Sequence, residues 1–185
     1  GGKTSLIKQL AQQYRHTKVL VSPTTKIYPM QSDVLCTTNK AAADCMPRAG
    51  VTCCGAKNAK TGKLEALDGQ VLEQIMPRYD LVLLEADGSR GLPCKGWQAH
   101  EPVIPACATH TIGVVTLGGL GRPATENWVH NLPEFLALTG LKRGETIGFD
   151  ALAAMVCGQQ GMLRNAVGRP IVLLNQVESA RAEQS

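Results

Sequence analysis

The chain has 185 residues, a length that suits one domain of ordinary size with a substantial core. Its residues are 44% hydrophobic but only 4% aromatic, so the core must be aliphatic. The formal net charge of +4, without a long basic block, gives little support to nucleic acid as a partner. No apolar run approaches the roughly 20 residues that span a bilayer, so we expect no membrane partner.

The chain contains seven cysteines. An odd number of cysteines favours reduced thiols over a disulfide framework. The sequence therefore indicates a cytoplasmic protein.

The first five residues, Gly1-Gly2-Lys3-Thr4-Ser5, match the second half of a phosphate-binding loop. Gly2, Lys3 and Thr4 take the last three positions of the pattern G-x-x-x-x-G-K-[ST], so we expect the parent chain to begin earlier. Glycines let successive N–H groups point at an anion, and the following helix adds its positive end. Lys3 would reach the β- and γ-phosphates of ATP or GTP, and the Thr4 hydroxyl would bind Mg²⁺.

Apolar residues recur at helical spacing directly after this motif: Leu6, Ile7, Leu10, Ala11 and Tyr14. This periodicity predicts a helix from about Lys3 to Tyr14 with one apolar face. A helix at this place is what a phosphate-binding loop requires.

A short apolar run at residues 18–21, bounded by Ser22-Pro23, predicts a buried parallel strand. Thr24, Thr25 and Lys26 follow at its C-terminal end, the edge where α/β sheets bind ligands. These side chains could meet Mg²⁺, phosphate or an anionic substrate. The alternative is a polar loop that only caps the strand.

Residues 51–54 predict another strand, residues 57–63 contain turn formers, and residues 64–67 form a second short run. This pattern favours a β-hairpin inserted in the α/β core. Asp68 is then expected to cap a helix that runs to about Met76 and ends at Pro77.

The second informative stretch begins with the aliphatic residues 81–84, which predict a strand buried on both faces. Glu85 and Asp87 emerge at its C-terminal end, where P-loop proteins place a carboxylate that holds Mg²⁺. The spacing does not decide between the two acids. Arg90 and Lys95 could pair with phosphate or substrate charge. The alternative is an Asp-Gly turn with solvated charges.

His100 and Glu101 lie on a loop stiffened by Pro102 and Pro105. They could bind substrate or exchange protons, but the sequence favours a structural loop.

The remaining chain predicts strands at residues 111–117 and 170–174 and helices at about 133–138 and 150–157, the second capped by Asp150. A further helical turn is expected within residues 158–167. Asn175 and Glu178 follow the last strand, where GTP-binding P-loop proteins carry Asn-Lys-x-Asp. Two of those four positions differ here, so ATP and GTP both stay open.

Because apolar strands alternate with helical stretches, we expect a three-layer α/β, P-loop NTPase-like fold. Its sheet should be mostly parallel, with helices on both faces and a small inserted β-hairpin. We expect one such domain over residues 1–185, truncated at both ends and lacking its first strand.

The chain resembles the YqeC family of accessory proteins for selenium-dependent molybdenum hydroxylases, also called selenium cofactor biosynthesis proteins. The resemblance lies in five stretches, residues 1–4, 19–27, 85–91, 100–105 and 175–177. The sequences Glu-Ala-Asp-Gly-Ser-Arg and His-Glu-Pro-Val-Ile-Pro are the most specific of these. The strand followed by Glu85 is also similar to the P-loop proteins that accompany molybdopterin guanine dinucleotide.

The resemblance implies a cytoplasmic P-loop protein that helps to mature such a hydroxylase or its molybdenum or selenium cofactor. The residues leave the activity open between two main hypotheses. One is a Mg²⁺-dependent NTP hydrolase or small-molecule kinase, with Lys3 and Mg²⁺ neutralising the phosphates and Arg90 adding a cation. The other is a nucleotide-gated binding module with negligible turnover.

A third hypothesis concerns the cysteines that gather in one segment: Cys36, Cys45, Cys53 and Cys54. Thiolates suit selenium, copper or zinc. No C-x-x-C spacing is present, so the sequence favours buried free thiols.

Overall fold

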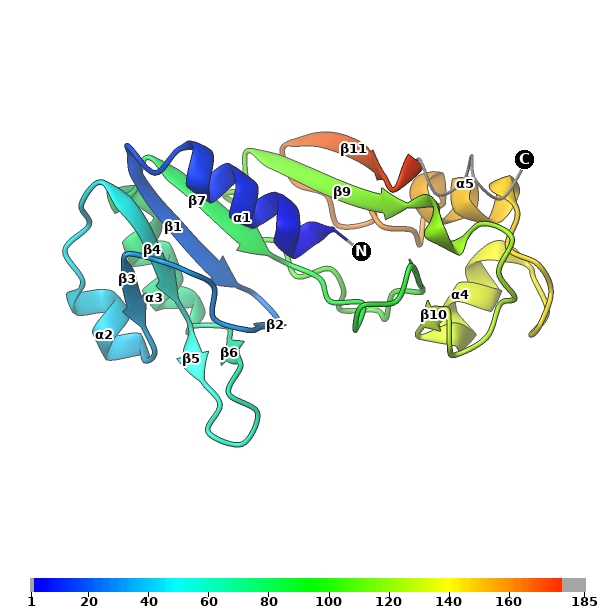
Figure 1. The fold of residues 1–185 in the computed structure, drawn as a ribbon, viewed down its shortest axis with the longest axis horizontal. Coiled ribbons are helices and arrows are strands. Elements are labelled where there is room, and N and C mark those ends of the chain that lie inside the picture. The colour runs from blue at the N-terminus through cyan, green and yellow to red at the C-terminus, as the bar shows by residue number, and fades with distance from the viewer. Residues whose placement is uncertain (1, 178–185) are drawn as a thin grey trace. The chain divides into compact units, whose positions relative to one another are not determined.

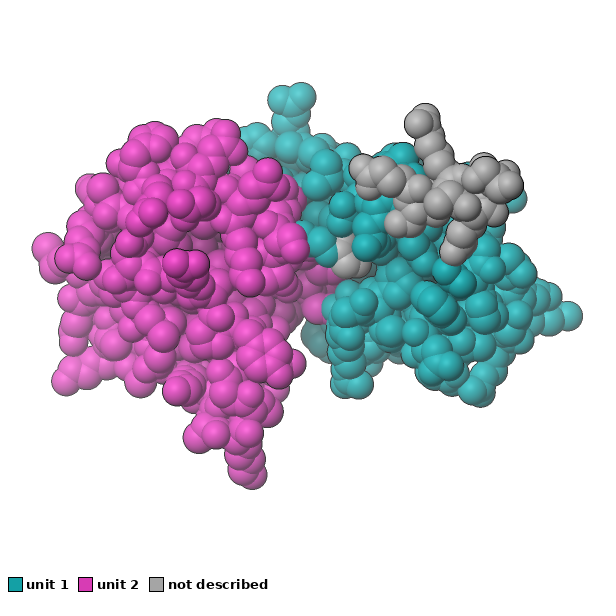
Figure 2. Space-filling view, viewed as in Figure 1, with its two compact units in different colours: residues 1–2, 89–185 teal, residues 3–88 magenta. Residues whose placement is uncertain are grey.

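The computed structural model of the protein describes residues 2–177, which belong to two compact units (Figures 1 and 2). One unit comprises residues 3–88, and the other comprises residues 89–177 together with Gly2. Each unit has its own sheet and its own hydrophobic core. The single P-loop domain over residues 1–185 stays a prediction.

The unit of residues 3–88 is built on a four-stranded sheet whose neighbouring strands all run parallel. In sheet order, the strands are β3 (Val34–Cys36), β4 (Gly50–Cys54), β1 (Lys18–Pro23) and β7 (Leu81–Glu85). Val19 pairs with Val51 on one side and with Leu81 on the other. The four strands therefore end at one edge, which carries Glu85.

Helices cover both faces of this sheet because side chains alternate along β1. Val19 and Val21 pack against Ile7 and Ala11 of α1 (Lys3–Gln13), which lies along one face (Figure 1). Leu20 points the other way, into a cluster formed with α2 (Asn39–Asp44) and α3 (Gly69–Ile75). The predicted mixed α/β fold with parallel strands is confirmed in this unit.

A small antiparallel sheet joins β2 (Lys26–Ile27), β6 (Leu64–Glu65) and β5 (Ala56–Lys57), in that order. The predicted hairpin is present as β5 and β6, but its first arm was wrongly placed at residues 51–54. Those residues belong to β4, whose five residues are all buried, and they pair with β1 in the parallel sheet. Residues 27–49, for which the sequence predicted no element, contain β3 and α2.

Both predicted helices are present, and Asp68 is the N-cap residue of α3 as predicted, whereas the predicted cap Asp150 is wrong. The Asp68 side chain makes no capping hydrogen bond to α3 and instead accepts a hydrogen bond from Asn39 Nδ2 at 2.7 Å. The cap of α5 (Phe149–Cys157) is Gly148, so Asp150 lies inside the first turn. Pro77 lies in a short 3₁₀ helix, Met76–Arg78, that follows α3.

The unit of residues 89–177 contains two parallel strand pairs. They are β9 (His110–Thr116) with β11 (Arg169–Asn175), and β8 (Cys94–Lys95) with β10 (Val129–His130). Its core surrounds the fully buried Phe135 of α4 (Leu132–Thr139) and includes residues of α5. A short 3₁₀ helix, Leu117–Gly119, follows β9. The helical turn expected within residues 158–167 is absent, since that segment forms only hydrogen-bonded turns.

Among the described residues, no helix has both the length and the apolar character needed to cross a bilayer.

Leu20→Ala should strongly destabilise the unit of residues 3–88. Leu20 is 0% exposed, so the truncation leaves a cavity, and we expect a loss of about 2–5 kcal/mol in the free energy of unfolding. Urea denaturation followed by far-ultraviolet circular dichroism measures it. Leu35→Ala is the matched control, because Leu35 is 48% exposed in β3 of the same sheet and its truncation should cost less than about 1 kcal/mol. Equal losses would contradict the assigned core.

Candidate functional site

The hydroxyl of Thr4 contacts the carboxylate of Glu85. Thr4 lies in the first turn of α1, and Glu85 is the last residue of β7. Thr4 Oγ1 donates a hydrogen bond to Glu85 Oε2 at 2.8 Å. Of the two acids that the sequence left open, Glu85 is therefore the one that touches the threonine.

Lys3 and Asp87 lie beside this pair. Lys3 Nζ is 4.0 Å from Asp87 Oδ2, and the two side chains are largely buried. The first turn of α1 contains no acidic residue, so its own side chains do not neutralise the positive end of the helix. The first N–H groups of a helix have no partner within the helix, and a helix N-terminus is the kind of place where anions bind.

The loop after β1 is attached to the backbone of Glu85. Thr24 N–H donates to the Glu85 carbonyl oxygen at 3.1 Å, and Thr25 Oγ1 donates to the same oxygen at 3.4 Å. Lys26 lies apart from them in β2, where its amine forms an ion pair with Glu65 at 2.8 Å. The two threonines are thus placed at the site, and the lysine stabilises the small antiparallel sheet.

Burial raises the pKa of Glu85 above its ordinary value of 4.5, and the nearby charge of Asp87 adds to the rise. The hydrogen bond from Thr4 and the charge of Lys3 act in the opposite direction without cancelling it. Glu85 is only 8% exposed. A cation bound at this carboxylate would relieve the cost of its buried negative charge.

The donors here fit magnesium better than a soft metal. Among the described residues, no group of three histidine, cysteine, aspartate or glutamate side chains is arranged to hold a metal ion. Mg²⁺ bound with a nucleotide does not need such a group, since it uses one or two carboxylates together with phosphate oxygens and water. The Thr4 hydroxyl and the Glu85 carboxylate supply the hard oxygen donors for that arrangement.

The other predicted site residues are less closely tied to this pair. Ser5 is exposed on α1. Arg90 and Asn175 belong to the unit of residues 89–177, Arg90 as an exposed residue with φ of 52° and Asn175 at the end of β11. Gly2 has a φ of 107°, which suits glycine. Gly1 and Glu178 lie outside the described residues.

Lys95 does not serve as the free cation considered from the sequence. Its side chain is 4% exposed, and its amine forms an ion pair with Glu101 at 2.7 Å. Glu101 also accepts hydrogen bonds from Gln98 N–H and from Asn131 Nδ2. Burial alone would raise the pKa of Glu101, but the hydrogen bonds from Lys95 and from Gln98 N–H, with the charges of Lys95 and His100, bring it below its usual value. Glu101 therefore has the structural role that the sequence favoured for this loop. His100 is exposed.

Sequence reasoning missed Ser22, which is completely buried near the end of β1. Its hydroxyl has no hydrogen-bond partner among the described residues. The sequence placed Ser22 at the boundary of the predicted strand, and its position directly after three apolar residues is the signal that could have drawn attention to it.

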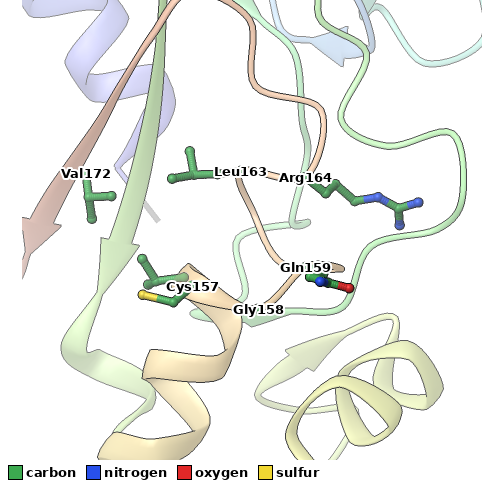
Figure 3. Close-up of a pocket in the computed structure, with 7 residues that line it drawn as sticks. Cys157, Gly158, Gln159, Leu163, Arg164 and Val172 are labelled. Carbon is green, nitrogen blue, oxygen red and sulfur yellow. The ribbon is translucent and has the colours of Figure 1, made fainter.

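An open hollow of about 450 Å³ lies in the other unit (Figure 3). Its lining comes from α5, the turns after it and β11: Val156, Cys157, Gly158, Gln159, Leu163, Arg164 and Val172. None of these was predicted as a site residue. The Arg164 guanidinium donates to the carbonyl oxygens of Gln98 and Ala99, both at 3.2 Å, so its charge fixes the loop that contains Glu101.

The wild-type protein should lose stability as pH rises, because Glu85 must then ionise while it is buried. Glu85→Gln should remove this loss. A raised pKa means that the folded protein holds the proton more tightly than the unfolded chain does. The contribution of Glu85 to the free energy of unfolding is therefore favourable in acid, and it is lost as pH rises through the pKa of Glu85 in the folded protein. We therefore expect the free energy of unfolding of Glu85→Gln, minus that of the wild type, to grow between about pH 4 and pH 8.

Urea unfolding across this pH range tests the expectation in the absence of nucleotide. Thr4→Ala removes a hydrogen bond that favours the charged carboxylate, so the loss of stability should become larger and extend to a higher pH. A difference between Glu85→Gln and wild type that stays constant with pH would contradict the assigned environment of Glu85.

Two comparisons bear on the identity of the chain. A family profile described as YqeC protein matches residues 1–133. The curated protein called Uncharacterized protein YqeC, from Escherichia coli (strain K12), is 34% identical over 180 residues, which cover 89% of this chain and 68% of that protein. No solved structure matches the chain. The profile match and the shared sequence together show that this chain belongs to the YqeC family.

Proposed function

We propose that the protein binds a nucleoside triphosphate, ATP or GTP, together with Mg²⁺, and hydrolyses it or transfers its terminal phosphoryl group. The observation that carries this proposal is the 2.8 Å hydrogen bond between Thr4 and Glu85. A hydroxyl from the first helical turn and a carboxylate from a neighbouring strand end are the protein ligands that hold Mg²⁺ in P-loop NTPases.

Each residue at the site has a role in this proposal. The N–H groups at the start of α1 receive the phosphate oxygens, and Lys3 approaches the outer phosphates as a point charge. Thr4 and Glu85 hold the metal ion, which neutralises charge on the phosphates. Asp87 keeps the Lys3 amine near the site at 4.0 Å. Catalysis is then mainly positioning and charge stabilisation.

The biological setting that we propose is the maturation of a selenium-dependent molybdenum hydroxylase. It is supported by the family resemblance of the Glu85–Gly91 and His100–Pro105 stretches. The partner is the hydroxylase itself or its molybdenum or selenium cofactor.

A second candidate function, a nucleotide-gated binding module with negligible turnover, is favoured by one contact pattern. The loop at Thr24 and Thr25 is hydrogen-bonded to the backbone of Glu85. Metal binding at the Glu85 carboxylate can therefore reorder this loop without any chemical step. A partner would dock on the reordered loop.

Lys3→Ala should weaken nucleotide binding about 10- to 100-fold, because a charge-assisted hydrogen bond to phosphate contributes about 1.5–3 kcal/mol. Isothermal titration calorimetry with Mg-ATP and Mg-GTP measures the loss and identifies the preferred base. Lys8→Ala is the matched control, since Lys8 is an exposed lysine on the same helix. Equal affinities for the two variants would contradict a phosphate site at Lys3.

Glu85→Gln should remove the dependence of nucleotide binding on Mg²⁺, because a neutral amide is a poor ligand for a hard cation. Titrations with and without Mg²⁺ measure this dependence. Phosphate release from ATP and GTP then separates the two candidate functions. Mg²⁺-dependent release that Lys3→Ala abolishes supports the hydrolase, whereas binding without release rules out hydrolysis and leaves phosphoryl transfer and the gated module. If the wild type binds neither nucleotide, both functions are wrong.

A further inference from the structure

The small antiparallel sheet in the unit of residues 3–88 carries a basic surface. Its lysines are Lys26 in β2, Lys57 in β5, and Lys60 and Lys63 in the turn that joins β5 to β6. This hairpin projects from the rest of the unit (Figure 1). We call Tyr28, Lys57, Lys60 and Lys63 the basic hairpin surface.

The one acidic residue in the hairpin, Glu65, is already engaged. Its carboxylate forms an ion pair with Lys26 at 2.8 Å and accepts a hydrogen bond from Asn58 Nδ2 at 2.9 Å. Within the described part of the chain, no acidic side chain forms an ion pair with the three lysines of the basic hairpin surface. Their positive charges are therefore not balanced locally.

The turn that presents these lysines is internally hydrogen-bonded. Asn58 N–H donates to the Lys63 carbonyl oxygen at 2.8 Å, and Gly62 N–H donates to the Asn58 carbonyl oxygen at 2.9 Å. Asn58 Oδ1 also accepts from the N–H groups of Lys60 and Thr61. Gly62 has a φ of 69°, which favours glycine. Because the backbone is ordered in advance, a ligand has less conformational entropy to remove when it binds.

Tyr28 adds an aromatic side chain to this surface. It is 66% exposed, and the Lys63 ammonium lies 4.9 Å from the centre of its ring. The pairing of β2 with β6 explains the contact, since one further step along the register brings Tyr28 opposite Lys63. The surface thus combines an exposed aromatic ring with positive charge, and aromatic residues are enriched where proteins bind one another.

We propose that the basic hairpin surface docks an acidic segment of a partner protein, rich in aspartate and glutamate. Carboxylates of the segment pair with the lysines, and its apolar atoms pack on the Tyr28 ring. Docking of this kind needs neither Mg²⁺ nor a nucleotide, so it is independent of the proposed function.

Two observations favour a protein over a nucleic acid as the partner. Lys63 covers one face of the Tyr28 ring, whereas single-stranded nucleic acids stack their bases on open aromatic faces. Residues 26–28 and 56–65 also contain no arginine, the residue best suited to bidentate phosphate recognition.

Fluorescence anisotropy of a labelled decaglutamate peptide, titrated with the full chain, tests the proposal. We expect binding that weakens as NaCl is raised from about 50 mM to about 500 mM, because salt screens exposed charges. Replacing Lys57, Lys60 and Lys63 together by Gln should weaken binding about tenfold or more. The matched control removes the same charge from three exposed lysines outside the surface, Lys8, Lys40 and Lys142, and should have a smaller effect.

Tyr28→Ala separates the aromatic contribution from the charges. It should weaken peptide binding without changing the salt dependence, because it removes contact area but no charge. A decauridylate RNA serves as the competing ligand. The proposal is overturned if the wild type does not bind the peptide, if the two triple variants weaken binding equally, or if the RNA binds more tightly than the peptide. Circular dichroism confirms that each variant is folded.

Discussion

The common direction of β1, β3, β4 and β7 is the constraint on which the candidate site depends. Parallel strands bring their carboxyl ends to one edge, and this edge receives Glu85 and the loop at Thr24. The same arrangement aligns Cys36 with Cys54. Hydrophobic burial of β1 under α1 then brings Thr4 to within 2.8 Å of the Glu85 carboxylate. Packing energy thus holds together two polar groups that contribute little to stability themselves.

The sequence predicted the part of this site that rests on strong local patterns. The helical period after Lys3 specifies α1, and the short continuous aliphatic runs before Pro23 and before Glu85 specify β1 and β7. The spacing could not decide between Glu85 and Asp87. That choice depends on how the end of β7 and the residues after it pack beside α1, and only the packed structure supplies it.

Other features depend on contacts between distant residues and could not be predicted. The run at residues 51–54 was assigned to a hairpin because a turn follows it, but complete burial makes it a strand of the parallel sheet. Lys26 and Lys95 looked like free cations, and each has an acidic partner, Glu65 and Glu101, whose approach depends on the fold. Cys53 lies on the opposite face of the sheet from Cys36 and Cys54, and this separation follows from the alternation of β4, once its register with β1 is known.

The alternation of β1 also has a consequence for how this sequence can change. Val19 and Val21 serve one layer of helices, while Leu20 serves the other. Substitutions of similar size can be absorbed at each position. A single residue inserted upstream of Pro23 would rotate every following side chain to the wrong layer, burying valines where leucine belongs and detaching the threonine loop from Glu85. We therefore expect β1 to tolerate substitutions of similar size more readily than insertions or deletions.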